Sequence, residues 1–296
     1  MATREEIASL LYLLDDPDDF VQQSVKQRFE ELGERSVPLL DEFRSTTKNP
    51  TQRRTLDNVI LKLTFPSLEQ DFLNFLEGGI LSITELEAAV LMLARIDNPT
   101  LREEEYIRML NRMAMEIQGE INYTLQPLKH LKVLTEHVYV RHGYSPAREN
   151  YFKPEYAHLH RVLESKTGIP ITLAFISLFL ARRLELPLSG VNMPIHFMMR
   201  FDFDTQVAFI DPFNYGKIVT MGECLNFLKR HNVRPEQGYF LSAHPAQMLI
   251  RAMRNMHNSY TKENDTLRAS CMELLITHFE LLYTSGPPDE SDSPTS

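Results

Sequence analysis

The sequence predicts an α+β fold in which many helices surround a small antiparallel sheet. Two observations support this fold class. Most of the chain has apolar residues at the spacing typical of helices. Between two helical parts, four short apolar runs indicate strands: LSGVNM, HFMMRF, QVAFID and KIVTM. Because these runs follow one another closely, antiparallel pairing through hairpins is expected.

The first 65 residues are predicted to be helical throughout. One helix precedes an Asp-Asp-Pro stop, a second ends at Gly33, and a third begins with Ser36 as its N-cap and Pro38 in its first turn. This order of helices and turns resembles a HEAT-type repeat of about one and a half units. Such repeats need neighbours to bury their apolar faces, so we expect these helices to cover one side of a larger core.

Helical periodicity continues over residues 66–125 and, after Pro127, to a stop at Gly143. A very apolar helix over residues 169–186 precedes the strands. The last part of the chain is predicted as a helical hairpin that turns at residues 262–265, followed by a disordered tail with no apolar residue to pack. The expected parts are a HEAT-like region, a core domain, a C-terminal helical hairpin and a tail: residues 1–65, 66–245, 246–283 and 284–296.

Composition argues against several classes of function. The net charge is −9, and the best basic run, Lys129 to Lys132, is too short for a nucleic-acid face. No apolar run reaches the roughly 18–20 residues of a membrane span, and the charged N-terminus lacks the apolar centre of a signal peptide. The two cysteines, Cys224 and Cys271, form no CxxC or Cys/His cluster. We expect a cytoplasmic protein with no metal or other cofactor and no membrane or nucleic-acid partner.

His196 and Asp211 are the residues that most strongly indicate a functional site. They lie in HFMMRF and QVAFID, the second and third predicted strands. Opposite residues of an antiparallel pair have position numbers with a constant sum. A turn centred between Phe203 and Asp204 therefore places His196 directly opposite Asp211, on one face of the sheet. A carboxylate beside an imidazole selects the ring tautomer and raises its basicity, as a catalytic base requires. A structural hydrogen bond near a sheet edge fits the same pattern.

Four blocks of the sequence, in order, resemble the SirB-type branch of the transglutaminase-like superfamily, a bacterial group. The blocks are NYFKPEYAHLHRVLESKTGIPITL, LARRLELPLSGVNMPIHF, IDPFNYG and LIRAMRNMHNSYTKENDTLRA. The resemblance covers about residues 66–245 and is strongest from Tyr151 to Gly216. It implies a small antiparallel sheet packed on a central helix, closed by tetratricopeptide-like helices. In this superfamily a nucleophilic cysteine opens the central helix, a histidine starts one strand and an aspartate ends the next.

Carried over residue by residue, the superfamily's histidine matches His196 and its aspartate matches Asp211. The cysteine position, counted back from the helix end LARRL, falls on Pro170. Proline suits the first turn of a helix, where its missing N–H needs no partner, but it has nothing to deprotonate. The resemblance therefore implies a Cys-His-Asp site that retains two of its three residues. Glu185 similarly replaces the glycine usual at the end of this helix.

Two other residues are candidates for a substitute nucleophile. Thr172 lies two positions after Pro170, roughly 200° around the helix, so its hydroxyl should face away and bond within the first turn. Cys224 lies in the helix after the sheet, where a small buried side chain is common. Met193, Met198 and Met199, around the hairpin, fit either a core or an adaptable methionine-rich cleft.

These observations leave two functional hypotheses. The first is a non-catalytic transglutaminase-like protein that acts as a cytoplasmic interaction module. Its His196–Asp211 pair would be structural or would help to hold a protein or peptide partner. The second is a hydrolase or amidase in which His196, held by Asp211, activates water, with oxyanion donors among the amides after Pro170. The two hypotheses differ in whether the imidazole accepts a proton during turnover.

Overall fold

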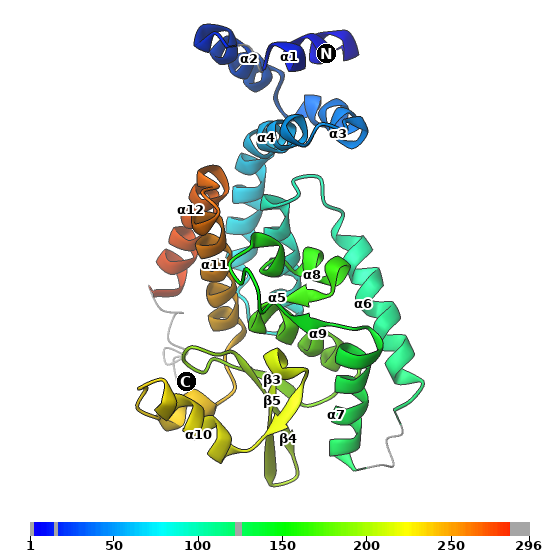
Figure 1. The fold of residues 1–296 in the computed structure, drawn as a ribbon, viewed down its shortest axis with the longest axis vertical. Helices are drawn as coiled ribbons and strands as arrows, with labels where there is room; N and C mark the ends of the chain where they lie inside the picture. The colour runs from blue at the N-terminus through cyan, green and yellow to red at the C-terminus, as the bar shows by residue number, and fades with distance from the viewer. Residues whose placement is uncertain (1–2, 15–16, 122–125, 285–296) are drawn as a thin grey trace, which may run out of the picture. The chain divides into compact units, whose positions relative to one another are not determined.

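The structure, a computed structural model, describes residues 3–14, 17–121 and 126–284 (Figure 1). The chain separates into two compact units, which are residues 1–74 with 94–101 and residues 75–93 with 102–296. Residues 285–296 of the tail that the sequence predicts to be disordered lie outside the described part of the chain.

The described part of the first unit is built of helices. They are α1 (Arg4–Leu13), α2 (Asp19–Leu32), η1 (Gly33–Ser36), α3 (Val37–Thr46), the greater part of α4 (Pro50–Glu77) and η2 (Ala94–Ile96). Asp18 caps α2 by accepting a 2.8 Å hydrogen bond from the amide of Phe20, and Gly33, with a φ of +61°, ends this helix. Apolar side chains of α1 to α4 form the core of the unit: Ile7, Leu11, Val25, Phe29, Leu40, Leu56 and Ile60.

Helix α4 continues without interruption through Pro66. The boundary expected between residues 65 and 66 therefore falls inside one helix. Proline is most common in the first turn of a helix, which is why the sequence around Pro66 looks like a helix start. The HEAT-like character of the first helices stays a prediction, as do the boundaries expected at residues 245 and 283.

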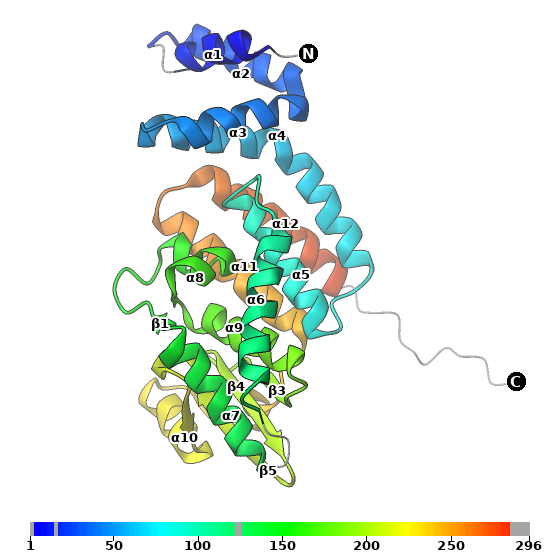
Figure 2. The ribbon, with the colours of Figure 1, turned by 90° about the vertical axis from the view of Figure 1, so that its right-hand side faces the viewer.

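The second unit contains the sheet, and its helices gather around α9 (Figure 2). Its helices are α5 (Ile83–Leu93), α6 (Glu103–Gln118), α7 (Pro127–Thr135), η3 (Glu136–Arg141), η4 (Pro154–Tyr156), α8 (Leu159–Ser165), α9 (Pro170–Arg183), η5 (Pro212–Asn214), α10 (Met221–Arg230), η6 (Gln237–Phe240), α11 (Pro245–Lys262) and α12 (Thr266–Thr284). Its strands are β1 (Ser145–Pro146), β2 (Thr167–Gly168), β3 (Leu188–Val191), β4 (Met198–Phe203), β5 (Gln206–Asp211) and β6 (Lys217–Val219).

The four predicted strands form one antiparallel sheet in the order β3-β4-β5-β6, which confirms the α+β fold class. Side chains alternate between the two faces of this sheet. Met198 and Phe209 pack with Cys224 and Leu228 of α10, so α10 covers one face. On the other face Phe201 is fully buried, and α9 contacts β3 and β4. The sheet is therefore covered on both sides.

Helix α9 is the buried centre of the second unit. All its residues from Pro170 to Ala181 are buried, and α5, α6, α7, α8 and α11 contact it. The helix ends at Arg183, and two residues later Glu185 has a φ of +54°. This left-handed conformation favours glycine, the residue that the resemblance implies at this position.

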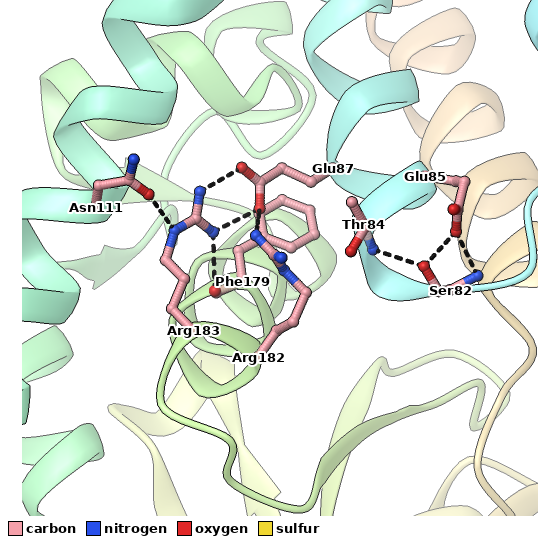
Figure 3. A network of polar contacts seen from close by, with 8 residues as sticks. All are labelled: Ser82, Thr84, Glu85, Glu87, Asn111, Phe179, Arg182 and Arg183. Carbon is pink, nitrogen blue, oxygen red and sulfur yellow. Dashed lines mark hydrogen bonds and ion pairs between the residues drawn. The ribbon is translucent and has the colours of Figure 1, made fainter.

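A buried ion pair holds the end of α9 (Figure 3). Glu87 of α5 accepts two hydrogen bonds of 2.6 Å from the guanidinium of Arg183, one on each carboxylate oxygen. Arg183 also donates to Asn111 of α6 at 2.7 Å and to the carbonyl of Phe179 at 2.9 Å. Three helices are thereby joined at one end of the central helix.

The last two helices, α11 and α12, pack against each other and are joined by residues 263–265, close to the predicted turn. Their tetratricopeptide-like character stays a prediction. In the described ranges, no helix combines the length and the apolar composition that crossing a membrane would require.

Candidate functional site

The structure brings His196 and Asp211 into direct contact. Nε2 of His196 lies 2.7 Å from Oδ1 of Asp211, and both side chains are largely buried. Asp211 ends β5 and caps η5, because the same Oδ1 accepts a 2.9 Å hydrogen bond from the amide of Phe213. The carboxylate is thus fixed by the turn that follows it and in turn orients the imidazole.

The register predicted for the hairpin is wrong by two residues. Phe203 pairs with Gln206, so the turn consists of Asp204 and Thr205, and the register continues so that Met198 would face Asp211. His196 lies in the bend before β4 and reaches Asp211 diagonally. A shift of two residues leaves a side chain on the same face of a sheet, so the contact forms despite the error.

Ile195, immediately before His196, has a strained backbone. Its φ is +69°, a conformation that is rare for a β-branched residue, and its side chain is 58% exposed. Strain of this kind persists only where the surrounding structure enforces it. The neighbouring residues do so here, because Arg251 donates a 2.8 Å hydrogen bond to the carbonyl of Met193. The bend that presents His196 is therefore held from outside the sheet.

The His196–Asp211 pair lines a cavity of about 630 Å³, called here the His196 cavity. Its walls come from the sheet, the turn after β5 and α10: Met193, His196, Met198, Asp211, Asn214, Lys217, Val219, Glu223, Cys224, Asn226, Phe227, Lys229 and Arg230. The ring of Phe227 lies 5.5 Å from the imidazole, centroid to centroid. Met193 and Met198 belong both to this wall and to a buried cluster, so the core and cleft interpretations of these methionines both apply.

The charges of the cavity are mixed. Lys217 and Glu223 form an ion pair at 3.2 Å, and Thr220 and Glu223 cap α10 by a reciprocal pair of hydrogen bonds. Lys229 and Arg230 lie on the exposed last turn of α10, where their charges complement the helix dipole. Sequence reasoning missed these lining residues of α10, because helical spacing alone does not reveal which face meets the sheet.

Pro170 begins α9 and is buried, as expected for the first turn of this helix. It is not among the residues that line the His196 cavity. The sequence suggested that the hydroxyl of Thr172 bonds within the first turn of the helix, and this expectation is wrong. The hydroxyl donates a 3.4 Å hydrogen bond to the carbonyl of Ala157 instead, because residues 156 and 157 lie beside the start of α9, where the amide of Ile169 also bonds to the carbonyl of Tyr156 at 3.1 Å. Thr172 is 1% exposed and is not in the cavity wall.

Cys224 shares the His196 cavity but is poorly suited to attack. Burial, followed by the charges of Glu223 and Asp211, raises the pKa of its thiol to about 11. The thiol therefore stays protonated near neutral pH, and the thiolate is the nucleophilic form. In the described residues no hydrogen bond joins Cys224 to His196. Cys271 is buried in α12, away from this wall.

The geometry leaves one imidazole nitrogen available. With Nε2 bonded to Asp211, only Nδ1 can accept a hydrogen bond or a proton from a ligand in the cavity. Within the ranges that the structure describes, no three His, Cys, Asp or Glu side chains gather as they would to hold a metal ion. His158 and His160, two neighbouring histidines of the second unit, are both buried, and Nε2 of His158 contacts the hydroxyl of Tyr260 at 2.6 Å.

Comparisons with known proteins agree on one family. Residues 104–254 match the model of the transglutaminase-like superfamily. The chain is 31% identical over 204 residues to a UPF0162 protein of Xylella fastidiosa (strain 9a5c), covering 64% of this chain and 70% of that protein. It is 24% identical over 200 residues to a UPF0162 protein of Vibrio cholerae, covering 65% of this chain and 73% of the relative.

A eukaryotic protein is also similar. The chain is 26% identical over 202 residues to F-box only protein 21 of Homo sapiens, covering 61% of this chain but 31% of that protein. No solved structure matches the chain.

Proposed function

Because the chain belongs to the transglutaminase-like superfamily but has Pro170 at the position of its nucleophilic cysteine, we propose that it is a non-catalytic member of that superfamily. Its function is to bind a peptide or protein partner in the His196 cavity. We place it in the SirB-type branch, as a cytoplasmic interaction module.

The side chain at position 170 carries this proposal. The superfamily reaction needs a thiolate at the start of the central helix, and proline offers no group that can attack. Loss of the nucleophile in a triad enzyme costs on the order of a million-fold in turnover. Neither Thr172, which is buried and bonded to Ala157, nor Cys224, whose thiol stays protonated, supplies a replacement.

The His196 cavity supports a binding role. Its volume of about 630 Å³ is within the range of ligand pockets, and it combines apolar walls with a few fixed polar groups. Nδ1 of His196 offers one hydrogen-bonding position to a ligand, held in place by Asp211. The mixed charges and methionines of the wall suit a peptide segment that carries both polar and apolar side chains.

One observation favours the competing function, a hydrolase or amidase. A carboxylate-bound imidazole with a free Nδ1 is the arrangement of a general base that activates water. The cavity beside it has room for a substrate. In that case turnover would depend on His196 and would not depend on either cysteine.

The test separates binding from turnover. A panel of amide and ester substrates, and a cysteine-directed peptide probe, are offered to the native chain. We expect that none of the substrates is turned over. We also expect that any labelling by the probe is unchanged in His196→Ala. Hydrolysis that disappears in His196→Ala but survives in Cys224→Ser would establish the hydrolase instead.

The binding arm uses selection from a displayed random-peptide library on the purified native chain. Selected peptides should bind His196→Ala at least tenfold more weakly. His257→Ala serves as the matched control, because His257 lies on α11 and is not part of the cavity wall. Peptides that bind all three proteins equally would refute a role for this cavity.

A further inference from the structure

Arg251 of α11 carries a charge that no acidic side chain balances. Its Nη1 donates to Oδ1 of Asn192 and to the carbonyl of Met193, both at 2.8 Å. Its guanidinium carbon lies 5.5 Å from the ring centroid of Phe197. These partners are all neutral, and in the described part of the chain no carboxylate forms an ion pair with Arg251.

Two other arginines of the second unit are paired with acidic side chains. Arg254, one turn further along α11, bonds to Glu280 at 2.7 Å, and Arg200 bonds to Asp202 at 2.6 Å. Arg251 is more buried than Arg254, and burial lowers the pKa of its guanidinium. A cation that is partly withdrawn from water loses hydration, and an anion compensates for this loss more fully than neutral acceptors do. The arrangement therefore leaves a charge to be compensated.

Arg251 lines a groove of about 520 Å³, called here the Arg251 groove. Its walls contain no acidic residue: Asn192, Gly238, Tyr239, Gln247, Ile250, Arg251 and Arg254. Both hydrogen bonds of the guanidinium use Nη1, which leaves Nε and Nη2, the two donors along one edge. This edge matches two oxygens of one carboxylate or one phosphate group.

We propose that the Arg251 groove is an anion-binding site, which takes the carboxylate or phosphate group of a ligand on the free edge of Arg251. The site is separate from the His196 cavity, because the two share no lining residue. The Arg251 groove is nonetheless connected to the His196 cavity, since Arg251 holds residues 192 and 193 of the segment that presents His196. The proposal does not depend on whether His196 binds a peptide or activates water.

The first experiment measures thermal unfolding of the full chain in titrations with inorganic phosphate and with succinate, each against sodium chloride at equal ionic strength. A ligand that binds only the folded state raises the melting temperature as its concentration exceeds its dissociation constant. We expect such a rise with at least one of the two anions. The tighter of them indicates whether the natural group is a phosphate or a carboxylate.

Variants assign the effect to Arg251. Arg251→Gln should weaken the binding of the anion at least tenfold, while Arg234→Gln, which removes an exposed arginine outside the groove, should leave it unchanged. Asn192→Asp provides an independent test, because it replaces the amide oxygen that accepts from Arg251 with a negatively charged carboxylate oxygen. This variant should melt at a higher temperature without any anion and should bind the added anion at least tenfold more weakly.

Two results would overturn the proposal. One is a melting temperature that responds to phosphate and succinate no more than to sodium chloride. The other is an anion affinity that is the same in the native chain and in Asn192→Asp, which applies even where Arg251→Gln does not fold.

Discussion

Two acid–base pairs of the second unit have similar contact distances and very different surroundings. Glu87 contacts Arg183 at 2.6 Å, and Asp211 contacts His196 at 2.7 Å. In the first pair every nitrogen of Arg183 donates to a protein acceptor, which is Glu87, Asn111 or the carbonyl of Phe179, although Arg183 and Asn111 also line a pocket of about 370 Å³. The second pair lines a cavity, and one ring nitrogen of its histidine has no bond to protein in the described residues.

The two pairs differ in how completely protein groups use their hydrogen-bonding atoms. The hydrogen bonds of the Glu87–Arg183 pair join α5, α6 and α9, so this pair serves the position of the central helix. The His196–Asp211 pair lines a cavity, and Nδ1 of its imidazole makes no hydrogen bond to protein in the described residues. At the other end of α9, Pro170 retains the helix start without the reactive group. The proposed non-catalytic role thus rests on the proline at this helix start and on the pair at the cavity.

Removal of the buried acid should have the largest effect. Glu87→Ala leaves Arg183 as an uncompensated buried cation, and we expect a loss of about 3–5 kcal/mol in the free energy of unfolding. Urea unfolding followed by circular dichroism measures this loss. Glu85→Ala is the matched control on the same helix, since Glu85 is only half-buried and caps the first turn through Ser82 (Figure 3). Equal losses in the two variants would contradict a structural role for the pair.

Asp211→Ala should have an intermediate effect. It removes the acceptor of both the imidazole and the Phe213 amide, so we expect a loss of about 1–3 kcal/mol in stability. Asp211→Asn retains an oxygen that can accept from the amide and should lose less. If Asp211→Asn is as unstable as Asp211→Ala, the stabilisation by Asp211 comes mainly from its charge and not from its hydrogen bond to the turn.

Cys224 should give a smaller effect that is confined to alkaline pH. Because burial raises the pKa of its thiol from 9.0 to about 11, the folded state holds the proton more tightly than the unfolded state. The resulting stabilisation is complete below the ordinary pKa and is lost as pH rises towards about 11. Between these values, native protein should therefore lose more stability than Cys224→Ala does, as measured by urea unfolding. Parallel pH profiles would show that the thiol ionises normally.

His196→Gln should have the smallest effect on stability. The glutamine amide can still donate to Asp211, so the free energy of unfolding should change by about 1 kcal/mol or less. The same variant lacks a proton acceptor at the position of Nδ1. Differential scanning calorimetry checks the stability, and a change well above 1 kcal/mol would assign this pair a supporting role like that of Glu87.

Local patterns in the sequence identified much of the core correctly. The four β-like runs became the strands of one sheet, and the apolar stretch before them became α9. The side-chain contact between His196 and Asp211 was also accessible, because alternation along strands specifies the face of each residue. The register of the hairpin could not be predicted in this way, since it depends on the two residues that form the turn, Asp204 and Thr205. Neither residue provides a strong turn signal.

Sequence alone supplied the residue types on which the functional hypotheses rest: a proline where the resemblance implies a cysteine, and a histidine and an aspartate that flank one hairpin. Only the tertiary structure decided what surrounds them. The pairing of Glu87 with Arg183, the contacts of Arg251 with Asn192, and the cavity between α10 and the sheet all join residues far apart in the chain. Periodicity reports the local environment of a residue, whereas burial, charge balance and open space depend on which distant elements pack together.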